Sequence, residues 1–175
     1  MQTTHPTYSF RLDRRTIYLT AVHFAVYILA GVLLYRLYEG GYLSAWFTSF
    51  VAALIALMTL SIPRRIAVTD QAVEIRCLCD ITEIRLDEIA SVRTVPQEQM
   101  RLHMPLFAGC GFFGYYGHFL DIRGFDTVLI YASEWRNFVE ITDIYDDRVI
   151  VSCRHAAELI AAIDRARIAA SSAGQ

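Results

Sequence analysis

Two long apolar segments near the start of the chain constrain its fold more than any other feature. Residues 16–38 are interrupted only by His23 and Arg36, and residues 43–62 contain no charged side chain. At about 1.5 Å per residue, helices of these lengths span roughly 34 and 30 Å, which matches the hydrocarbon thickness of a bilayer. The four residues between the segments are too few for a separate element, so the pattern predicts an antiparallel transmembrane hairpin.

A secretory signal peptide is the alternative for the first segment, because arginines precede it. A signal peptide has an apolar stretch of only about 7–15 residues and ends at a cleavage site with small residues. The first segment is longer, and a second full-length segment follows it directly. These features favour two membrane spans over a cleaved leader.

The arginines indicate how the hairpin is oriented. Those at its outer ends are Arg11, Arg14, Arg15, Arg64 and Arg65. Only Arg36 lies near the turn, where Tyr35, Tyr38, Tyr42 and Trp46 form an aromatic belt. Because positively charged flanks stay in the cytoplasm, we expect both termini there.

Small residues recur along both segments at a spacing of four. They are Ala21 and Ala25 in the first segment and Ala45, Ser49 and Ala53 in the second, with Ala52 and Ala56 alongside. Such stripes let helices approach closely in lipid, so they predict either packing of the two spans on each other or a homo-oligomer interface. His23 is a functional candidate because it is ionisable inside a span, but the second span has no ionisable residue at matching depth.

The rest of the chain differs in composition. Residues 1–65 carry six arginines and two acids, a net charge of +4, whereas residues 66–175 carry ten arginines and sixteen acids, a net charge of −6. We therefore expect two parts: a cytoplasmic tail with the hairpin in residues 1–65, and a cytoplasmic domain in residues 66–175. The acidic second part argues against nucleic-acid binding and against electrostatic attachment to anionic lipid.

Residues 66–152 contain eight segments typical of β-strands. They are residues 66–69, 73–79, 82–86, 90–95, 117–123, 127–132, 138–144 and 148–152. Several alternate apolar and polar residues, and turn-forming residues separate them. Residues 156–170 instead repeat apolar residues at helical spacing. The pattern predicts a mainly β (α+β) domain: an antiparallel barrel or sandwich of about seven or eight strands, ordered as a meander and capped by a C-terminal helix.

Three blocks in this region resemble a known family. They are residues 66–70 (IAVTD) with 84–92 (IRLDEIASV), the glycine-aromatic run 107–117 (FAGCGFFGYYG), and the ending 149–153 (VIVSC) before the helix. In these blocks the chain resembles bacterial membrane proteins with a pleckstrin-homology (PH)-like domain, over most of residues 63–170. One departure is Cys153, where the family tends to have proline.

The resemblance implies a PH superfold, a place in the bacterial cytoplasmic (inner) membrane, and a binding module without an active site. We expect a membrane-anchored, non-catalytic module that recognises a protein or peptide partner through a sheet edge or the groove beside the terminal helix. The alternatives are a sensor of lipid headgroups or membrane state, and an enzyme. The loop at residues 79–83, where a phosphoinositide site would need basic residues, carries two acids.

The glycine-aromatic run supplies the candidate partner or membrane surface. The candidate residues are its five aromatic side chains, Phe107, Phe112, Phe113, Tyr115 and Tyr116. One possibility is that they form an exposed patch that meets the membrane surface or a partner protein. The other is that they belong to the core of the domain. The glycines fit the spacing G-x-G-x-x-G, but no helical segment follows them, so we expect turns or bulges rather than a dinucleotide site.

No catalytic, cofactor-binding or metal site is expected. Cys77 and Cys79 lie on one face of a predicted strand, but no second close pair accompanies them, as a zinc site normally requires. The reducing cytoplasm predicts free, buried thiols. The histidines 103, 118 and 155 are separated by strands and turns, and no serine or cysteine lies in a recognisable nucleophile motif.

Overall fold

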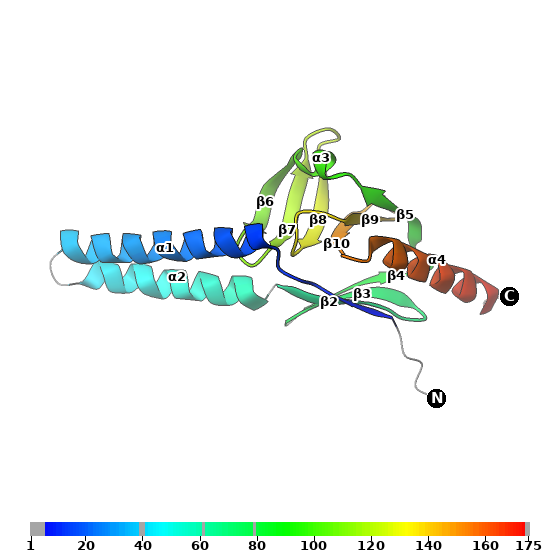
Figure 1. Cartoon of the computed structure of the whole chain (residues 1–175), viewed down its shortest axis with the longest axis horizontal. Helices are drawn as coiled ribbons and strands as arrows, with labels where there is room; N and C mark the ends of the chain where they lie inside the picture. Colours follow the sequence, from blue (N-terminus) through cyan, green and yellow to red (C-terminus); the bar gives the residue numbers. More distant parts are fainter. Residues whose placement is uncertain (1–5, 39–40, 61, 79, 174–175) are drawn as a thin grey trace, which may run out of the picture.

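The computed structural model describes residues 6–38, 41–60, 62–78 and 80–173. Two long antiparallel helices, α1 (Arg14–Leu37) and α2 (Tyr42–Leu60), extend from one side of a β-rich domain (Figure 1). The Asp13 carboxylate accepts a hydrogen bond from the Thr16 amide at 2.7 Å and caps the first turn of α1. The two predicted helices are confirmed, and their ends agree with the prediction to within two residues.

Neither long helix is buried in the domain. In α1 only Thr16 and Thr20 are buried, and they lie near the domain; no described residue of α2 is buried. Large apolar side chains such as Leu29 and Leu57 are exposed on both helices. By length and composition, both helices are able to cross a membrane.

Among the described residues, four strands form a first sheet in the order β1-β2-β3-β4, with antiparallel pairing throughout. They are β1 (Thr7–Ser9), β2 (Pro63–Val68), β3 (Ala72–Cys77) and β4 (Ile81–Arg85). Because β1 precedes α1 and β2 follows α2, the helical hairpin is inserted between two neighbouring strands. Tyr8 pairs with Ile66 and Ser9 with Arg65, so both ends of the hairpin are tied to the domain.

Six described strands form the second sheet in the order β5-β9-β10-β8-β7-β6. They are β5 (Ile89–Val95), β6 (His103–Cys110), β7 (Tyr115–Asp121), β8 (Asp126–Ala132), β9 (Phe138–Asp143) and β10 (Arg148–Ser152), and the short helix α3 (Gln97–Met100) precedes β6. β8 and β10 run parallel, whereas the other neighbours are antiparallel. The predicted meander is therefore wrong at this point, because the chain crosses over after β8 and places β9 between β5 and β10.

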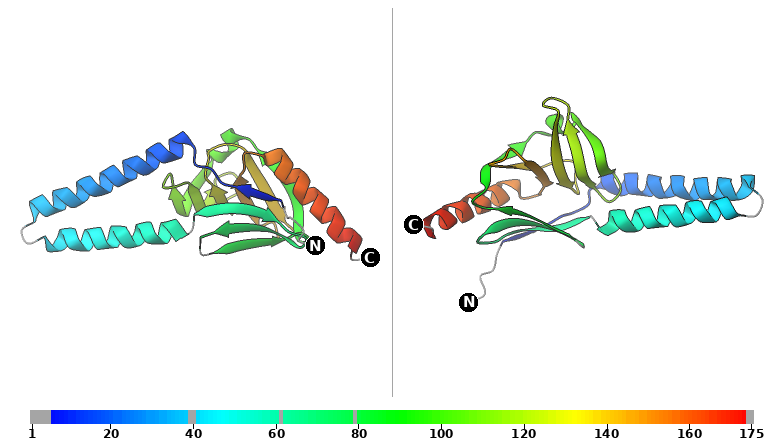
Figure 2. Two further views of the ribbon diagram at one scale, coloured as in Figure 1. Left: turned by 60° about the horizontal axis from the view of Figure 1, so that its bottom comes forward. Right: turned by 180° about the vertical axis from the view of Figure 1, so that it is seen from behind.

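The domain is a sandwich of two sheets rather than a closed barrel. Its C-terminal helix α4 (Ala156–Ala173) packs against β2, β5 and β9, at the end of the domain remote from the helical hairpin (Figure 2). The buried face of α4 consists of Leu159, Ala162 and Ile163, which follow helical spacing. The predicted fold class, two apolar helices before a mainly β domain with a C-terminal helix, is confirmed.

Candidate functional site

A groove lies beside α4, the helix at the end of the domain away from α1 and α2 (Figure 1 and Figure 2). It consists of two hollows of about 740 and 660 Å³. Leu86, Asp87 and Ala170 line both hollows, so the two are adjacent. We refer to this surface as the α4 groove.

The floor of the α4 groove is apolar. Leu86 and Ile89 are buried there, on either side of the turn between β4 and β5. The Leu86 amide donates a hydrogen bond to the Gln71 carbonyl oxygen at 2.8 Å, which holds this turn against the turn between β2 and β3. Ala170 of α4 completes the floor from the opposite side. Two turns and a helix that are distant in the sequence therefore build one surface.

Charged side chains surround this floor. Four carboxylates and two guanidinium groups line the groove: Asp70, Glu83, Asp87, Asp164, Arg85 and Arg167. One arginine already has carboxylate partners, because Arg85 Nη2 lies 2.6 Å from Asp87 Oδ2 and Arg85 Nε lies 3.6 Å from Glu88 Oε1. The hydrogen bond from Arg85 lowers the pKa of Asp87 below its ordinary value. The α4 groove therefore combines an acidic rim with an apolar floor.

The aromatic residues of the glycine-aromatic run do not form one exposed patch. Phe107 is 86% exposed and Phe113 is half-buried, whereas Phe112, Tyr115 and Tyr116 are buried. Both faces of β7 are covered, because Tyr116 packs in the core between the sheets and Tyr115 packs on Trp135, with ring centroids 4.3 Å apart. Burial raises the pKa of Tyr116 to about 12. Three of the five rings therefore belong to the interior, and the interpretation as a single exposed surface is wrong for them.

The turn between β6 and β7 is docked on α1. The Phe113 amide donates a hydrogen bond to Thr20 Oγ1 at 2.9 Å, and Thr20 Oγ1 lies 3.1 Å from the Gly111 carbonyl oxygen. Phe112 packs on Phe24, with ring centroids 5.4 Å apart. Gly111 has a φ of +81°, a conformation that favours glycine. Gly111 and Gly114 lie in the turn between β6 and β7, as the sequence predicts, whereas Gly109 lies within β6.

Replacing Thr20 with valine is expected to loosen this turn without unfolding α1, because valine keeps the shape of threonine but accepts no hydrogen bond. The lost bond should cost about 1 kcal/mol and accelerate hydrogen exchange of the Phe113 amide about fivefold. Hydrogen exchange of the full chain in micelles measures this effect. Thr48→Val is the matched control, because Thr48 Oγ1 donates to the Ser44 carbonyl oxygen of its own helix at 2.8 Å. Equal effects of the two substitutions at Phe113 would contradict the docking.

The flanking arginines lie where the sequence places them, next to the domain. All five are exposed: Arg11, Arg14, Arg15, Arg64 and Arg65. The small residues Ala45, Ser49 and Ala53 of α2 are exposed as well. A polar contact between the helices comes from a different position, where Ser44 Oγ donates to the Gly31 carbonyl oxygen at 3.2 Å. Packing of α1 on α2 therefore does not use this stripe, and a homo-oligomer interface stays a prediction.

His23 is bonded within its own helix. Its Nδ1 lies 2.7 Å from the Leu19 carbonyl oxygen, and its ring centroid is 6.3 Å from that of Phe112. The imidazole thus lies beside the docked turn. Its surroundings are those of a packed side chain.

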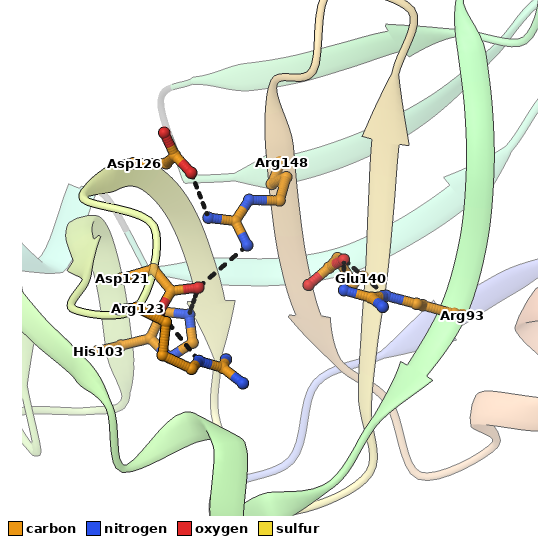
Figure 3. Close-up of polar contacts among 7 residues, drawn as sticks. All are labelled: Arg93, His103, Asp121, Arg123, Asp126, Glu140 and Arg148. Carbon is orange, nitrogen blue, oxygen red and sulfur yellow. Dashed lines mark hydrogen bonds and ion pairs between the residues drawn. The ribbon is translucent and has the colours of Figure 1, made fainter.

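A charged cluster that the sequence did not single out surrounds the buried carboxylate of Asp121 (Figure 3). The Asp121 carboxylate contacts Arg148 at 3.1 Å and Arg123 at 3.3 Å, and Arg148 also lies 3.6 Å from Asp126. Burial opposes ionisation of Asp121, but hydrogen bonds from the Arg123 amide and from Arg148 outweigh it and lower the pKa of this carboxyl. His103 lies 3.9 Å from the carboxylate. Burial lowers the pKa of His103, and the nearby carboxylate offsets this only in part.

The cluster joins strands of the six-stranded sheet. Asp121 ends β7, Asp126 begins β8 and Arg148 begins β10, so its contacts connect three strands. A separate pair, Arg93 and Glu140 at 2.6 Å, connects β5 with β9. An arginine pairs with each of these two carboxylates. The pKa of Asp121 is lowered, whereas a general acid needs a raised pKa. The sequence carries no signal for this cluster, because only the observed strand order brings its members together.

The described thiols are free: Cys77 is half-buried, Cys110 exposed and Cys153 buried. Cys79 lies outside the described residues. Burial, with a smaller contribution from Asp80, raises the pKa of Cys77 to about 11, whereas a metal ligand or nucleophile needs a thiolate. In the part of the chain that the structure describes, no three His, Cys, Asp or Glu side chains are grouped to hold a metal ion.

Two β-sheets followed by a C-terminal helix are consistent with a PH-like fold. A family model described as a bacterial PH domain matches residues 64–166, which is more than half of the chain. The chain therefore belongs to the bacterial PH domain family, as the resemblance predicts. Comparison with curated proteins and with solved structures gives no significant match. Membership suggests a binding or scaffold module, and PH-like domains are generally non-catalytic.

Proposed function

We propose that the chain is an integral protein of the bacterial cytoplasmic (inner) membrane, whose PH-like domain binds a segment of a protein partner in the α4 groove. α1 and α2 anchor the module in the bilayer, and the domain lies on the cytoplasmic side. The partner segment is basic and apolar, to match the acidic rim and the apolar floor. The module positions this partner at the membrane and catalyses no reaction itself.

The surface and the connections of the two long helices support the anchoring. α1 and α2 expose apolar side chains over most of their length, a surface that is unfavourable in water. Because β1 and β2 are paired, the chain enters and leaves the hairpin on the same side. A hairpin that enters the bilayer must therefore cross it twice. The five exposed arginines on that side favour a cytoplasmic domain and cytoplasmic termini.

The acidic rim around an apolar floor is the observation that carries the proposal for the partner. Leu86 and Ile89 offer an apolar floor on which side-chain anchors of a peptide can pack, and carboxylates such as Asp164 attract basic side chains. Helix α4, which borders the groove, lies at the end of the domain away from the helical hairpin (Figure 1), where a cytoplasmic protein has access. The net charge of −6 in residues 66–175 disfavours anionic lipid headgroups and nucleic acid. A lipid-headgroup or membrane-state sensor therefore ranks second, and an enzyme third.

Asp164→Arg is expected to weaken partner binding about tenfold, because it replaces attraction by repulsion at the rim of the groove. The measurement is photocrosslinking in whole cells, with a photoreactive amino acid in place of Ile168. This residue lines the groove and is exposed. The crosslinked peptide of the partner, identified by mass spectrometry, is expected to be basic and apolar.

Glu98→Arg is the matched control for this experiment. It makes the same change of charge at an exposed residue of α3, away from the groove. Crosslinking that survives both substitutions, or a partner peptide that is acidic, would overturn the proposed recognition. Crosslinking to lipid alone would favour the headgroup sensor.

A further inference from the structure

The hairpin of β6 and β7 differs in charge from the rest of the acidic domain. Residues 102–120 contain no Asp, Glu, Arg or Lys, although residues 66–175 together contain sixteen acids and ten arginines. β6 is also the edge strand of the six-stranded sheet. One side of this strand therefore has no strand neighbour among the described residues.

Four consecutive apolar residues of β6 are exposed. They are Met104, Pro105, Leu106 and Phe107, and the exposed fraction reaches 54% at Met104, 50% at Leu106 and 86% at Phe107. A regular strand of a sandwich alternates between exposed and buried residues, but a bulge between Pro105 and Phe107 breaks the alternation here. A continuous exposed apolar run of this kind marks a contact surface.

The edge itself is a poor template for another β-strand. Pro105 has no backbone N–H to donate, and the bulge interrupts the regular spacing of the backbone groups. Natural proteins use these same two features to prevent edge-to-edge pairing. The apolar side chains are therefore suited to a fluid apolar phase rather than to an added strand.

The β6–β7 hairpin lies beside the ends of the two long helices (Figure 1 and Figure 2). Phe107 lines a hollow of about 430 Å³ together with Leu57 and Met58, which belong to the last turns of α2. At the turn of the hairpin, Phe112 packs on Phe24 of α1. The hairpin is thus level with the last turns of α2 and with the first three turns of α1.

The thickness of a bilayer places these turns at its surface. A hydrocarbon core of about 30 Å takes about 20 helical residues. In α1, about 20 residues counted back from Leu37, at the end remote from the domain, reach Tyr18. In α2, which has 19 residues, the whole helix is needed to cross the hydrocarbon core. Thr20 and Met58 therefore lie at the boundary of the hydrocarbon core when the hairpin spans the bilayer.

We infer that β6 rests on the cytoplasmic surface of the same bilayer, with Met104, Leu106 and Phe107 immersed between the headgroups and the acyl chains. This inference rests on the proposed anchoring by α1 and α2. Water among the headgroups can bond the open backbone groups of the edge strand, which hydrocarbon cannot do. Two helices and one strand then hold the domain against the membrane, and the α4 groove faces the cytoplasm.

Tryptophan at position 107 tests the immersion in the full chain. Phe107→Trp and the control Tyr145→Trp, which lies in the exposed turn between β9 and β10, are reconstituted in phosphatidylcholine vesicles with plain or brominated acyl chains. The chain already contains two tryptophans, so the tryptophan fluorescence of the unsubstituted chain is subtracted to give the emission of the added ring. We expect bromine to remove about half or more of the added emission at position 107, with a blue shift typical of an interfacial ring, and almost none at position 145.

Alkaline carbonate extraction of the same vesicles distinguishes failure of the proposed anchoring from failure of the inference alone. A chain that is extracted has no spanning hairpin, which overturns the anchoring and this inference together. A chain that stays in the vesicles, but shows no more quenching at position 107 than at position 145, overturns the inference alone. Quenching at position 107 could also disappear as the ratio of protein to lipid rises. This result would show that β6 contacts another copy of the chain, and it would also overturn the inference.

Discussion

Replacing Asp121 with asparagine is expected to lower the free energy of unfolding of the domain by about 3 kcal/mol, because it leaves a buried guanidinium group without its main counter-charge. The Arg148 side chain is only 16% exposed, and its remaining carboxylate partner, Asp126, lies at 3.6 Å. Urea unfolding of the full chain in micelles measures the loss. The near-ultraviolet circular dichroism of the ring cluster around Trp135 is a suitable signal, since this ring packs on Tyr115 and Phe138.

Asp126→Asn is the matched control, because it removes the second carboxylate partner of Arg148. The Asp126 side chain is 65% exposed, so its contribution should stay below about 1 kcal/mol. Equal losses for the two variants would show that burial of the Asp121 carboxylate is not what makes it important.

The contribution of Asp121 should also depend on pH. The pKa of Asp121 is lower in the folded protein than in the unfolded chain, so the stabilisation is fully present above the unfolded value of about 4. It is lost as the pH falls through the folded value. The unfolding free energies of the unsubstituted chain and of Asp121→Asn should therefore approach each other as the pH falls below about 4, and converge below the folded pKa of Asp121.

Replacing Gly117 with alanine is expected to cost about 3 kcal/mol or more, because two independent penalties act at this position. Gly117 has a φ of +116°, which side-chain-bearing residues rarely adopt, and an added Cβ would lie 2.8 Å from the Ala108 Cα atom and closer still to the Phe107 carbonyl oxygen. Both are backbone atoms of β6, so the clash can be relieved only by separating the two strands. Faster hydrogen exchange in β6 of the full chain, together with a lower urea midpoint, measures the effect.

Gly124→Ala is the control for Gly117→Ala. An added Cβ at Gly124 would meet only the Asp126 carboxylate, and this exposed side chain can rotate away. We expect a change of less than about 0.5 kcal/mol. If both substitutions are tolerated equally, the close approach of β6 and β7 at Gly117 does not contribute to stability.

The sequence predicts the helices of this chain better than its strand order. Continuous apolar segments and helical periodicity are local properties, and they locate α1, α2 and α4 directly. The pairing of β8 with β10 is not local, because an alternating pattern shows that a strand has one buried face but not which strand lies beside it. β6 escapes the prediction for a related reason: its exposed run from Met104 to Phe107 lacks alternation, and its glycines resemble turn residues.

The candidate site shows the same limit. Proximity to the terminal helix was predictable, since an amphipathic helix on a sheet has an edge where side chains meet. The floor of the groove was not, because Leu86, Ile89 and Ala170 come from segments far apart in the chain and carry no motif. The aromatic run was conspicuous in the sequence. Composition alone cannot show, however, that Tyr115 and Tyr116 are buried on opposite faces of β7 while Phe107 is exposed.

The pairing of β1 with β2 has a consequence for how the protein is made. β1 leaves the ribosome before the two long helices, and its partner leaves after them, so the first sheet has to wait for the whole hairpin. If only one helix were inserted, Tyr8 and Ile66 would be on opposite sides of the membrane and could not pair as they do. If α1 and α2 span the membrane as proposed, the first sheet can therefore form only after both helices have been inserted.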